Sequence, residues 1–81
     1  MKDLIPSLPG NDVNLAFRLL DTRDFESLQS LVNSSIIRTR IALARANTKE
    51  KYLKADLEGM RKLQSEVDAY YEVLYPPSDN I

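Results

Sequence analysis

The stretch 53–75, LKADLEGMRKLQSEVDAYYEVLY, decides the fold class of this chain. Its apolar residues alternate in steps of four and three, as in the a/d seam of a heptad repeat, with one polar member. The seam positions are Leu53, Leu57, Met60, Gln64, Val67, Tyr71 and Leu74. This period predicts a long helix over 48–75. Pro76-Pro77 ends it, because proline lacks the amide donor and crowds the preceding residue, so we expect an extended tail over 76–81.

An amphipathic segment upstream predicts a second long helix over 23–46, with Asp24 and Glu26 in the first turn, where the helix dipole favours acidic groups. One apolar stripe consists of Phe25, Leu28, Val32, Ile36, Leu43 and Ala46, with Ser35 and Thr39 on the same side. A second stripe, which points away from the first, consists of Ile37, Ile41 and Ala44. An ordinary surface helix has one apolar face. We therefore expect this helix to pack on two sides, the second against the first helix and a partner chain.

The N-terminal residues 1–10, MKDLIPSLPG, predict an extended arm, because their prolines and glycine oppose a helix of any length. A short helix should follow over 12–20, with Asn11 or Asp12 as its capping residue. The chain is therefore expected to be all-α, with a single helical domain over 11–75 between the arm and the tail.

The link between the two long segments leaves two architectures open. Asn47, with Glu50 three residues later, is typical of a helix N-cap, and the apolar stripe is interrupted before Leu53. These features favour a long antiparallel helical hairpin folded about Asn47, in which Gly59 would lie opposite Ser35 and allow a close approach of the helices. The alternative is one long continuous helix in a coiled-coil oligomer, since no Gly or Pro marks a turn.

The composition excludes most enzyme classes. The chain has 81 residues, no Cys and no His, so it lacks a disulfide framework, the usual zinc ligands, a thiol nucleophile and an imidazole base. Its two glycines are too far apart for a phosphate-binding loop. The carboxylates of Asp68 and Glu72 share a helix face, which indicates a solvated acidic end rather than a metal site. We expect no enzyme, no catalytic residues, no cofactor, no metal and no small-molecule substrate.

Charge is distributed unevenly along the chain. The segment 38–62 holds eight basic and three acidic residues, a net charge of +5, and the remainder holds three basic and nine acidic residues, a net charge of −6. A hairpin would therefore have a basic turn and an acidic open end, which can orient the protein on a partner. Contacts to phosphate are conceivable for Arg38, Arg40, Arg45, Lys49, Lys51 and Lys54. Nucleic acid is the less favoured partner, because no binding motif is present and the overall net charge is −1.

A protein partner or a homo-oligomer is expected on grounds of stability, since cores below roughly 80 residues rarely supply more than about 3–5 kcal/mol. The residues expected to contact the partner are Leu4, Ile5, Leu8, Ile37, Ile41, Tyr70 and Tyr75. We predict a small structural or assembly protein that docks by its arm and its apolar helix faces. The alternative is a small regulatory or nucleic-acid-associated protein that uses the basic turn.

The cellular setting is predicted from size and from what the sequence lacks. No apolar run is long enough for a bilayer, and the first ten residues contain no signal-peptide core. We expect a location in the cytoplasm or within a virus particle, without secretion by a signal peptide. A bacteriophage particle is the favoured setting, because neighbours in a large assembly would hold proline-rich ends that fray in isolation.

Overall fold

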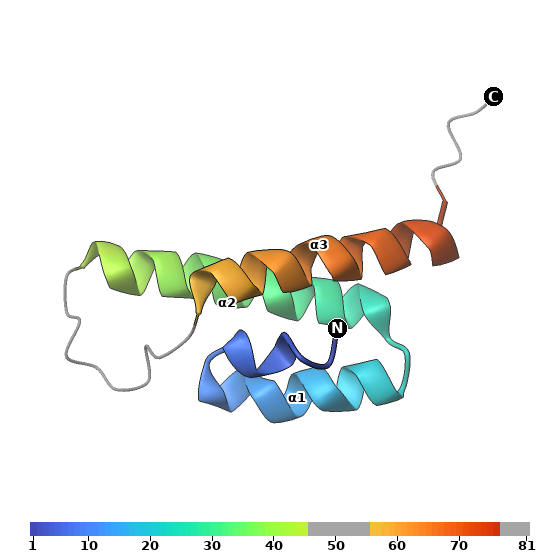
Figure 1. The fold of residues 1–81 in the computed structure, drawn as a ribbon, viewed down its shortest axis with the longest axis horizontal. Coiled ribbons are helices and arrows are strands. Elements are labelled where there is room, and N and C mark those ends of the chain that lie inside the picture. Colours follow the sequence, from blue (N-terminus) through green and yellow to red (C-terminus); the bar gives the residue numbers. More distant parts are fainter. Residues whose placement is uncertain (46–55, 77–81) are drawn as a thin grey trace.

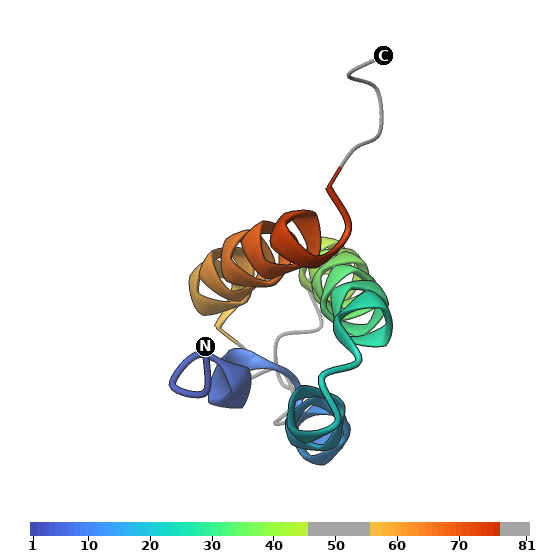
Figure 2. The same cartoon turned by 90° about the vertical axis from the view of Figure 1, so that its right-hand side faces the viewer.

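The computed structural model, which describes residues 1–45 and 56–76, confirms that the chain is all-α. A 3₁₀ turn, η1 (Ile5–Ser7), is followed by three α-helices, α1 (Gly10–Asp21), α2 (Phe25–Ala44) and α3 (Leu57–Leu74). No strand occurs within these two ranges. The helices α2 and α3 lie side by side, and η1 and α1 form a second layer against them (Figures 1 and 2).

The helices α2 and α3 run in opposite directions along their shared face (Figure 1). Two side-chain hydrogen bonds fix their register. Gln29 Nε2 donates to Asp68 Oδ1 at 2.8 Å, and one turn further along α2, Asn33 Oδ1 accepts from Gln64 Nε2. The partner number in α3 falls as the number in α2 rises, which is the signature of an antiparallel pair.

The start of α3 differs from the expectation. Asp56 is extended, with φ −91° and ψ 102°, and its side chain caps the helix by accepting from the Glu58 amide at 3.1 Å. The predicted helix over 48–75 is therefore wrong at its N-terminal end, and so is the single continuous helix. The expected capping pair Asn47 and Glu50 lies outside the described residues.

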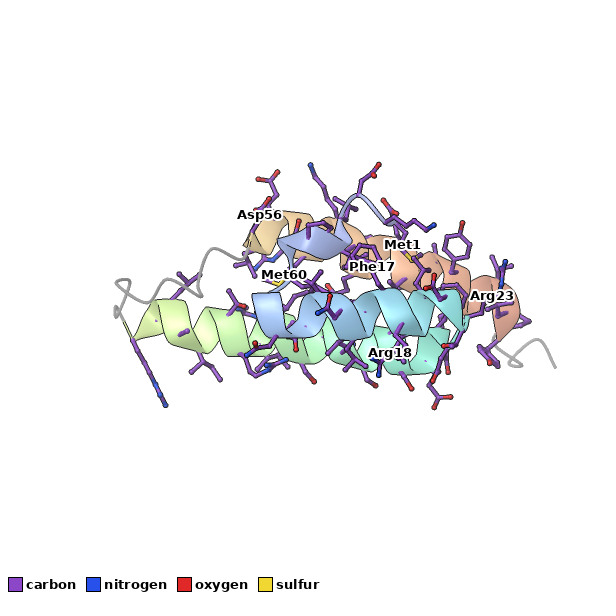
Figure 3. All side chains as sticks on the ribbon, turned by 90° about the horizontal axis from the view of Figure 1, so that it is seen from below. Met1, Phe17, Arg18, Arg23, Asp56 and Met60 are labelled. Atoms are coloured by element: carbon purple, nitrogen blue, oxygen red, sulfur yellow. The ribbon has the colours of Figure 1, made fainter. Side chains whose placement is uncertain are left out.

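The core lies between the two layers. On α2 the stripe expected to be buried is buried from Phe25 to Thr39, while Leu43 beyond it is exposed. Figure 3 views the molecule from the side of the covering layer, with Phe17 of α1 and Met60 of α3 directed into the interior. The buried apolar residues are Ile5, Leu8, Ala16, Phe25, Leu28, Val32, Ile36, Met60, Leu63 and Val67.

The N-terminal segment corrects the expected extended arm. Ile5 is 0% exposed and Leu8 is 3% exposed, and both belong to the core. Pro6 is compatible with the 3₁₀ turn because the first turn of a helix needs no amide donor at that position. The free energy of burying two large aliphatic side chains, about 1.5–3 kcal/mol each, favours the folded-back conformation over an extended arm.

The close approach made possible by Gly59 involves η1 rather than Ser35, which corrects the expectation for the hairpin. A Cβ atom added to Gly59 would lie 2.1 Å from Ser7 Oγ and 2.8 Å from Ser7 Cβ. The Asp56 amide also donates to the Ser7 carbonyl at 2.9 Å. The N-terminal segment is thus held directly against the first turn of α3.

The break expected after the first helix is present, and its backbone closes α1 in a Schellman motif. The Asp24 amide donates to the Leu19 carbonyl at 2.9 Å, and the Arg23 amide donates to the Leu20 carbonyl at 3.1 Å. Arg23 has φ 58°, in the left-handed region where glycine is usual. The Asp24 side chain then caps α2 by accepting from the Ser27 amide at 3.1 Å.

Candidate protein-docking site

The C-terminal ends of α2 and α3 project beyond the packed part of the molecule. No described residue of α2 after Thr39, and none of α3 after Val67, is buried. Since the two helices are antiparallel and staggered, each C-terminal end extends past the first turn of the other helix, at opposite ends of the pair (Figure 1). Among residues 1–45 and 56–76, no neighbouring helix covers either end.

These two ends hold most of the exposed apolar side chains. Among the described residues, seven of the eight exposed large hydrophobic side chains belong to the C-terminal halves of α2 and α3 or to Tyr75 directly after α3, and the eighth is Leu15 of α1. The seven are Ile37, Ile41, Leu43, Tyr70, Val73, Leu74 and Tyr75. Single exposed apolar residues are ordinary on a protein surface, but a concentration of them on unpacked helix ends indicates sites of contact with other molecules.

The end of α2 combines apolar and basic side chains. Ile37 is 56% exposed and Ile41 is 49% exposed, and they lie one turn apart on one side of the helix. Arg40 and Arg45 are exposed beside them and form no ion pair within the described part of the chain. Leu43, 44% exposed, lies on a different side of the helix, in line with the buried stripe. We call Ile37, Arg40, Ile41, Leu43 and Arg45, which together surround this end of the helix, the α2 surface.

The end of α3 combines apolar and acidic side chains. Val73 is 77% exposed, the largest value among the exposed hydrophobic residues, and Glu72 next to it is also exposed. The last turn of α3 carries no basic residue, so the negative end of the helix dipole adds to the charge of Glu72. We call the set Tyr70, Glu72, Val73, Leu74 and Tyr75 the α3 surface.

Aromatic contacts hold the two tyrosines of the α3 surface in place. The ring of Tyr70 stacks on Phe25, the first residue of α2, with ring centroids 5.4 Å apart and planes 5° from parallel. The ring of Tyr75 lies against Tyr71, with centroids 4.9 Å apart. Both tyrosines are still more than half exposed. A ring that is fixed on one face and free on the other loses little entropy when it binds a partner.

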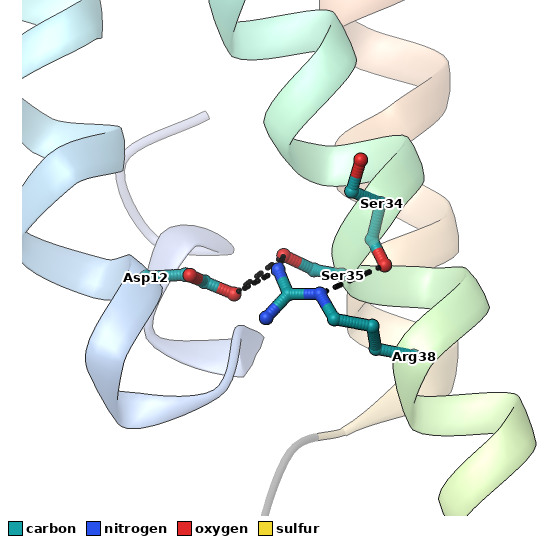
Figure 4. A network of polar contacts seen from close by, with 4 residues as sticks. All are labelled: Asp12, Ser34, Ser35 and Arg38. Carbon is teal, nitrogen blue, oxygen red and sulfur yellow. Dashed lines mark hydrogen bonds and ion pairs between the residues drawn. The ribbon is translucent and has the colours of Figure 1, made fainter.

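A polar network ties α1 to the middle of α2 (Figure 4). Ser35 Oγ, which is fully buried, donates to Asp12 Oδ2 at 2.7 Å, and Arg38 Nη2 donates to the same carboxylate oxygen at 2.9 Å. Arg38 Nε also donates to the Ser34 carbonyl at 3.3 Å. Asp12 was expected to cap α1, but α1 begins at Gly10 and the Asp12 side chain instead reaches α2. Arg38 therefore ties α2 to α1, although its side chain is still 56% exposed, and its contact with phosphate stays a prediction.

The structure separates the predicted partner contacts into two groups. Ile37, Ile41, Tyr70 and Tyr75 are exposed, as contact with a partner requires. Ile5 and Leu8 lie in the core and Leu4 packs against it, so the arm contributes to the chain's own interior. This placement corrects the predicted docking through the arm. The physical reason is that burying these apolar side chains stabilises the fold, because a core made by three short helices alone would be too small.

The structure describes only some of the residues that were predicted to contact phosphate. Arg40 and Arg45 are exposed on the α2 surface, and Lys49, Lys51 and Lys54 lie outside the described residues. Sequence reasoning missed Leu43 and Leu74 as surface residues because the apolar stripes of the two helices continue through them, and it gave no role to Val73.

An open cleft lies beside the α3 surface. It is lined by Met1, Lys2, Leu20, Asp21, Arg23, Phe25 and Tyr70. Its charged groups are of mixed sign and lie at its exposed edge, so the cleft presents no converging set of polar groups for a small ligand. Within residues 1–45 and 56–76, no cluster of three or more carboxylates could hold a metal ion.

Comparisons of the chain with protein-family models, with curated proteins and with solved structures gave no match. None of the helices in the described part combines the length and the apolar character needed to cross a bilayer.

Proposed function

We propose that this chain is a small structural or assembly protein that docks on protein surfaces through the C-terminal ends of α2 and α3. The observation that carries the proposal is the concentration of seven exposed large hydrophobic side chains on these two ends. An antiparallel helical hairpin would serve as the scaffold, in preference to a coiled-coil oligomer of long helices, and the antiparallel hydrogen bonds between α2 and α3 support it.

The energetics favour a partner of this kind. Each large apolar side chain moved from water into a contact contributes about 1.5–3 kcal/mol, which is large beside the stability expected of so small a domain. Tyrosine is enriched among the residues that dominate binding energy, and Tyr70 and Tyr75 are already held by neighbouring rings. A bacteriophage particle remains the setting we propose, on the basis of chain size and the absence of cysteine.

Photo-crosslinking tests the proposal directly. A photoreactive amino acid is placed at Ile41, at Val73 or, as a control, at Ser30, which is exposed on the packed half of α2. In the cell that makes the chain, we expect protein crosslinks from positions 41 and 73 and none from position 30. Mass spectrometry identifies the crosslinked chain. The absence of protein crosslinks from both 41 and 73 would contradict the proposal.

The second candidate, contact with nucleic acid, is favoured by one observation, the exposure of Arg40 and Arg45 without ion pairs in the described part. In that case the crosslinks from position 41 would be sensitive to nuclease. Binding to a labelled DNA or RNA would also weaken steeply with salt, because it releases counterions from phosphates. An apolar protein contact would persist or tighten under the same change.

A further inference from the structure

We infer that the partner of the α2 surface is the α3 surface of a second copy of this chain, so that copies associate head to tail. The inference rests on the proposed docking function and names the partner. It starts from the difference between the two surfaces: both are apolar, but one is rimmed by arginine and the other by carboxylate.

Charge complementarity is the first argument. Residues 37–45 contain three arginines and no acidic residue, whereas residues 68–76 contain Asp68 and Glu72 and no basic residue. Arg38 is bound to Asp12 and Asp68 is bound to Gln29, which leaves Arg40 and Arg45 facing solvent on one surface and Glu72 on the other. Opposite charges around apolar centres orient an encounter and set its register.

The same charges disfavour a symmetric dimer. A two-fold contact between two α2 surfaces would bring Arg40 and Arg45 of both copies together, and a two-fold contact between two α3 surfaces would oppose Glu72 to its counterpart. Like charges at an interface are unfavourable. Pairing one surface with the other instead sets a positively charged end against a negatively charged one.

The geometry of the helix pair is the second argument. The C-terminal ends of α2 and α3 point in opposite directions along the molecule (Figure 1). When a second copy is placed end to end with the first, the projecting α3 of one copy lies antiparallel to the projecting α2 of the next. That is the relation these helices already have within one chain, so the contact between copies repeats a packing that the molecule uses in its core.

The buried seams continue into the two projecting ends. On α2 the buried series reaches Ile36 and Thr39, and the next position of this stripe is Leu43, 44% exposed. On α3 the buried series reaches Val67, and its continuation at heptad spacing is Leu74, 51% exposed. In a head-to-tail pair, Leu43 of one copy and Leu74 of the next would cover each other. Within one chain, Leu28 and Leu63 are buried in the same seam.

A contact between two different surfaces leaves one free surface at each end of a dimer. Assembly therefore continues with concentration until it forms a filament, or a ring where the rotation between copies closes. This behaviour suits a structural component, and it differs from the fixed dimer that a symmetric contact would produce.

The test uses the full chain and two variants, each blocked at one surface. Leu43→Asp places a carboxylate on the seam position of the α2 surface, and Leu74→Asp places one on the seam position of the α3 surface, so the two altered surfaces also repel each other. Sedimentation velocity should show assembly of the wild-type chain that grows with concentration, and monomers of 9.2 kDa for each variant alone. An equimolar mixture should form a dimer of twice this mass and nothing larger, because one intact pair of surfaces remains and both outer ends are blocked.

Leu15→Asp is the matched control, since Leu15 is an exposed apolar residue of α1 outside both surfaces, and it should assemble like the wild type. Circular dichroism establishes that each variant is folded. If a variant does not fold, Arg40→Glu and Glu72→Arg replace the pair, because both residues are exposed and form no hydrogen bond or ion pair within the described ranges. Each should weaken assembly about tenfold or more alone, and an equimolar mixture should assemble beyond the dimer again, because the two reversed charges are of opposite sign.

Three results would overturn the inference: a wild-type chain that stays monomeric, a blocked variant that still dimerises alone, or a mixture that remains monomeric. None of these removes the proposed docking function, which is decided by crosslinking. Crosslinks from positions 41 and 73 to a different protein, together with a monomeric chain, would keep the docking function and reject the second copy as partner.

Discussion

At the scale of single residues, one carboxylate joins two helices. Asp12 is 7% exposed, and its Oδ2 atom accepts from both Ser35 and Arg38. The two donors differ in whether water can replace the carboxylate as their hydrogen-bond acceptor. Arg38 is largely exposed and can bond to water, whereas the Ser35 hydroxyl is fully buried. The energetic importance of Asp12 therefore lies mainly in satisfying Ser35.

We expect Asp12→Ala to lower the free energy of unfolding by about 1–3 kcal/mol, because the buried Ser35 hydroxyl loses its acceptor and keeps only the bond it accepts from Arg38. Urea denaturation followed by circular dichroism measures the change. Asp12→Asn keeps an acceptor and should recover part of the loss. In the double variant with Ser35→Ala the two effects should be less than additive, and full additivity would show that the bond contributes nothing.

Gly59 is the residue at which general helix propensity and local packing disagree. Alanine normally stabilises a helix interior by about 1 kcal/mol relative to glycine. At Gly59 the added Cβ would overlap Ser7, so we expect Gly59→Ala to destabilise the fold by about 1–3 kcal/mol, measured by thermal unfolding.

The neighbouring residue supplies the control for this prediction. Ser7→Gly removes the two atoms nearest the new methyl group and leaves only Asp56 Oδ2, at 3.0 Å, so it should restore most of the stability lost in Gly59→Ala. Gly10→Ala is a second control, because nothing lies within 4 Å of a Cβ atom there. Equal effects at Gly59 and Gly10 would contradict the close contact with η1.

At the scale of elements, the connection between α1 and α2 orients the covering layer. Three consecutive amides at Thr22, Arg23 and Asp24 donate to carbonyls of the last turns of α1, and Asp24 then caps α2. The cost of this compact connection is one non-glycine residue in the left-handed region, Arg23 at φ 58°.

Arg23→Gly should therefore raise the free energy of unfolding by about 1 kcal/mol, since glycine adopts this conformation without a steric penalty. Chemical denaturation is the measurement. Arg18→Gly, in the regular part of α1, should lower stability by about the same amount. A loss of stability at both positions would show that the side chain of Arg23 matters more than its backbone.

At the scale of the whole molecule, the N-terminal segment supplies core that three helices alone would lack. Ile5 and Leu8 are buried between the layers, and the Ser7 carbonyl accepts from the Asp56 amide at the start of α3. Contacts between the first ten residues and α3 close the molecule over a long span of sequence, so the N-terminal segment is part of the domain.

Ile5→Ala is expected to cost about 2–5 kcal/mol, as for other large aliphatic residues removed from a core. This amount is comparable with the whole stability expected at this size, so the thermal midpoint should fall strongly or the variant should unfold. Ile37→Ala is the control, because Ile37 is 56% exposed, and it should change stability by less than about 1 kcal/mol. A similar small effect at Ile5 would mean that the segment is detached in solution.

The sequence by itself determined the helical class, the break at 21–24 and the buried stripe of α2. These properties follow from the spacing of apolar residues and from capping side chains, which act within one or two turns. The stripe from Phe25 to Thr39 was predicted residue by residue for this reason. The same periodicity predicted that Ile37 and Ile41 point away from this stripe, but α1, which was expected to cover part of them, leaves both exposed.

Only the tertiary structure decided the position of the first ten residues, the start of α3 and the partner of Gly59. Each depends on contacts between distant segments, such as Ser7 with Asp56, that leave no periodic trace in the sequence. The stagger of α2 against α3 is likewise decided by contacts between distant segments. Because the register between helices is set by side-chain packing and by the bonds of Gln29 and Asn33, periodicity alone could not show which helix ends remain uncovered.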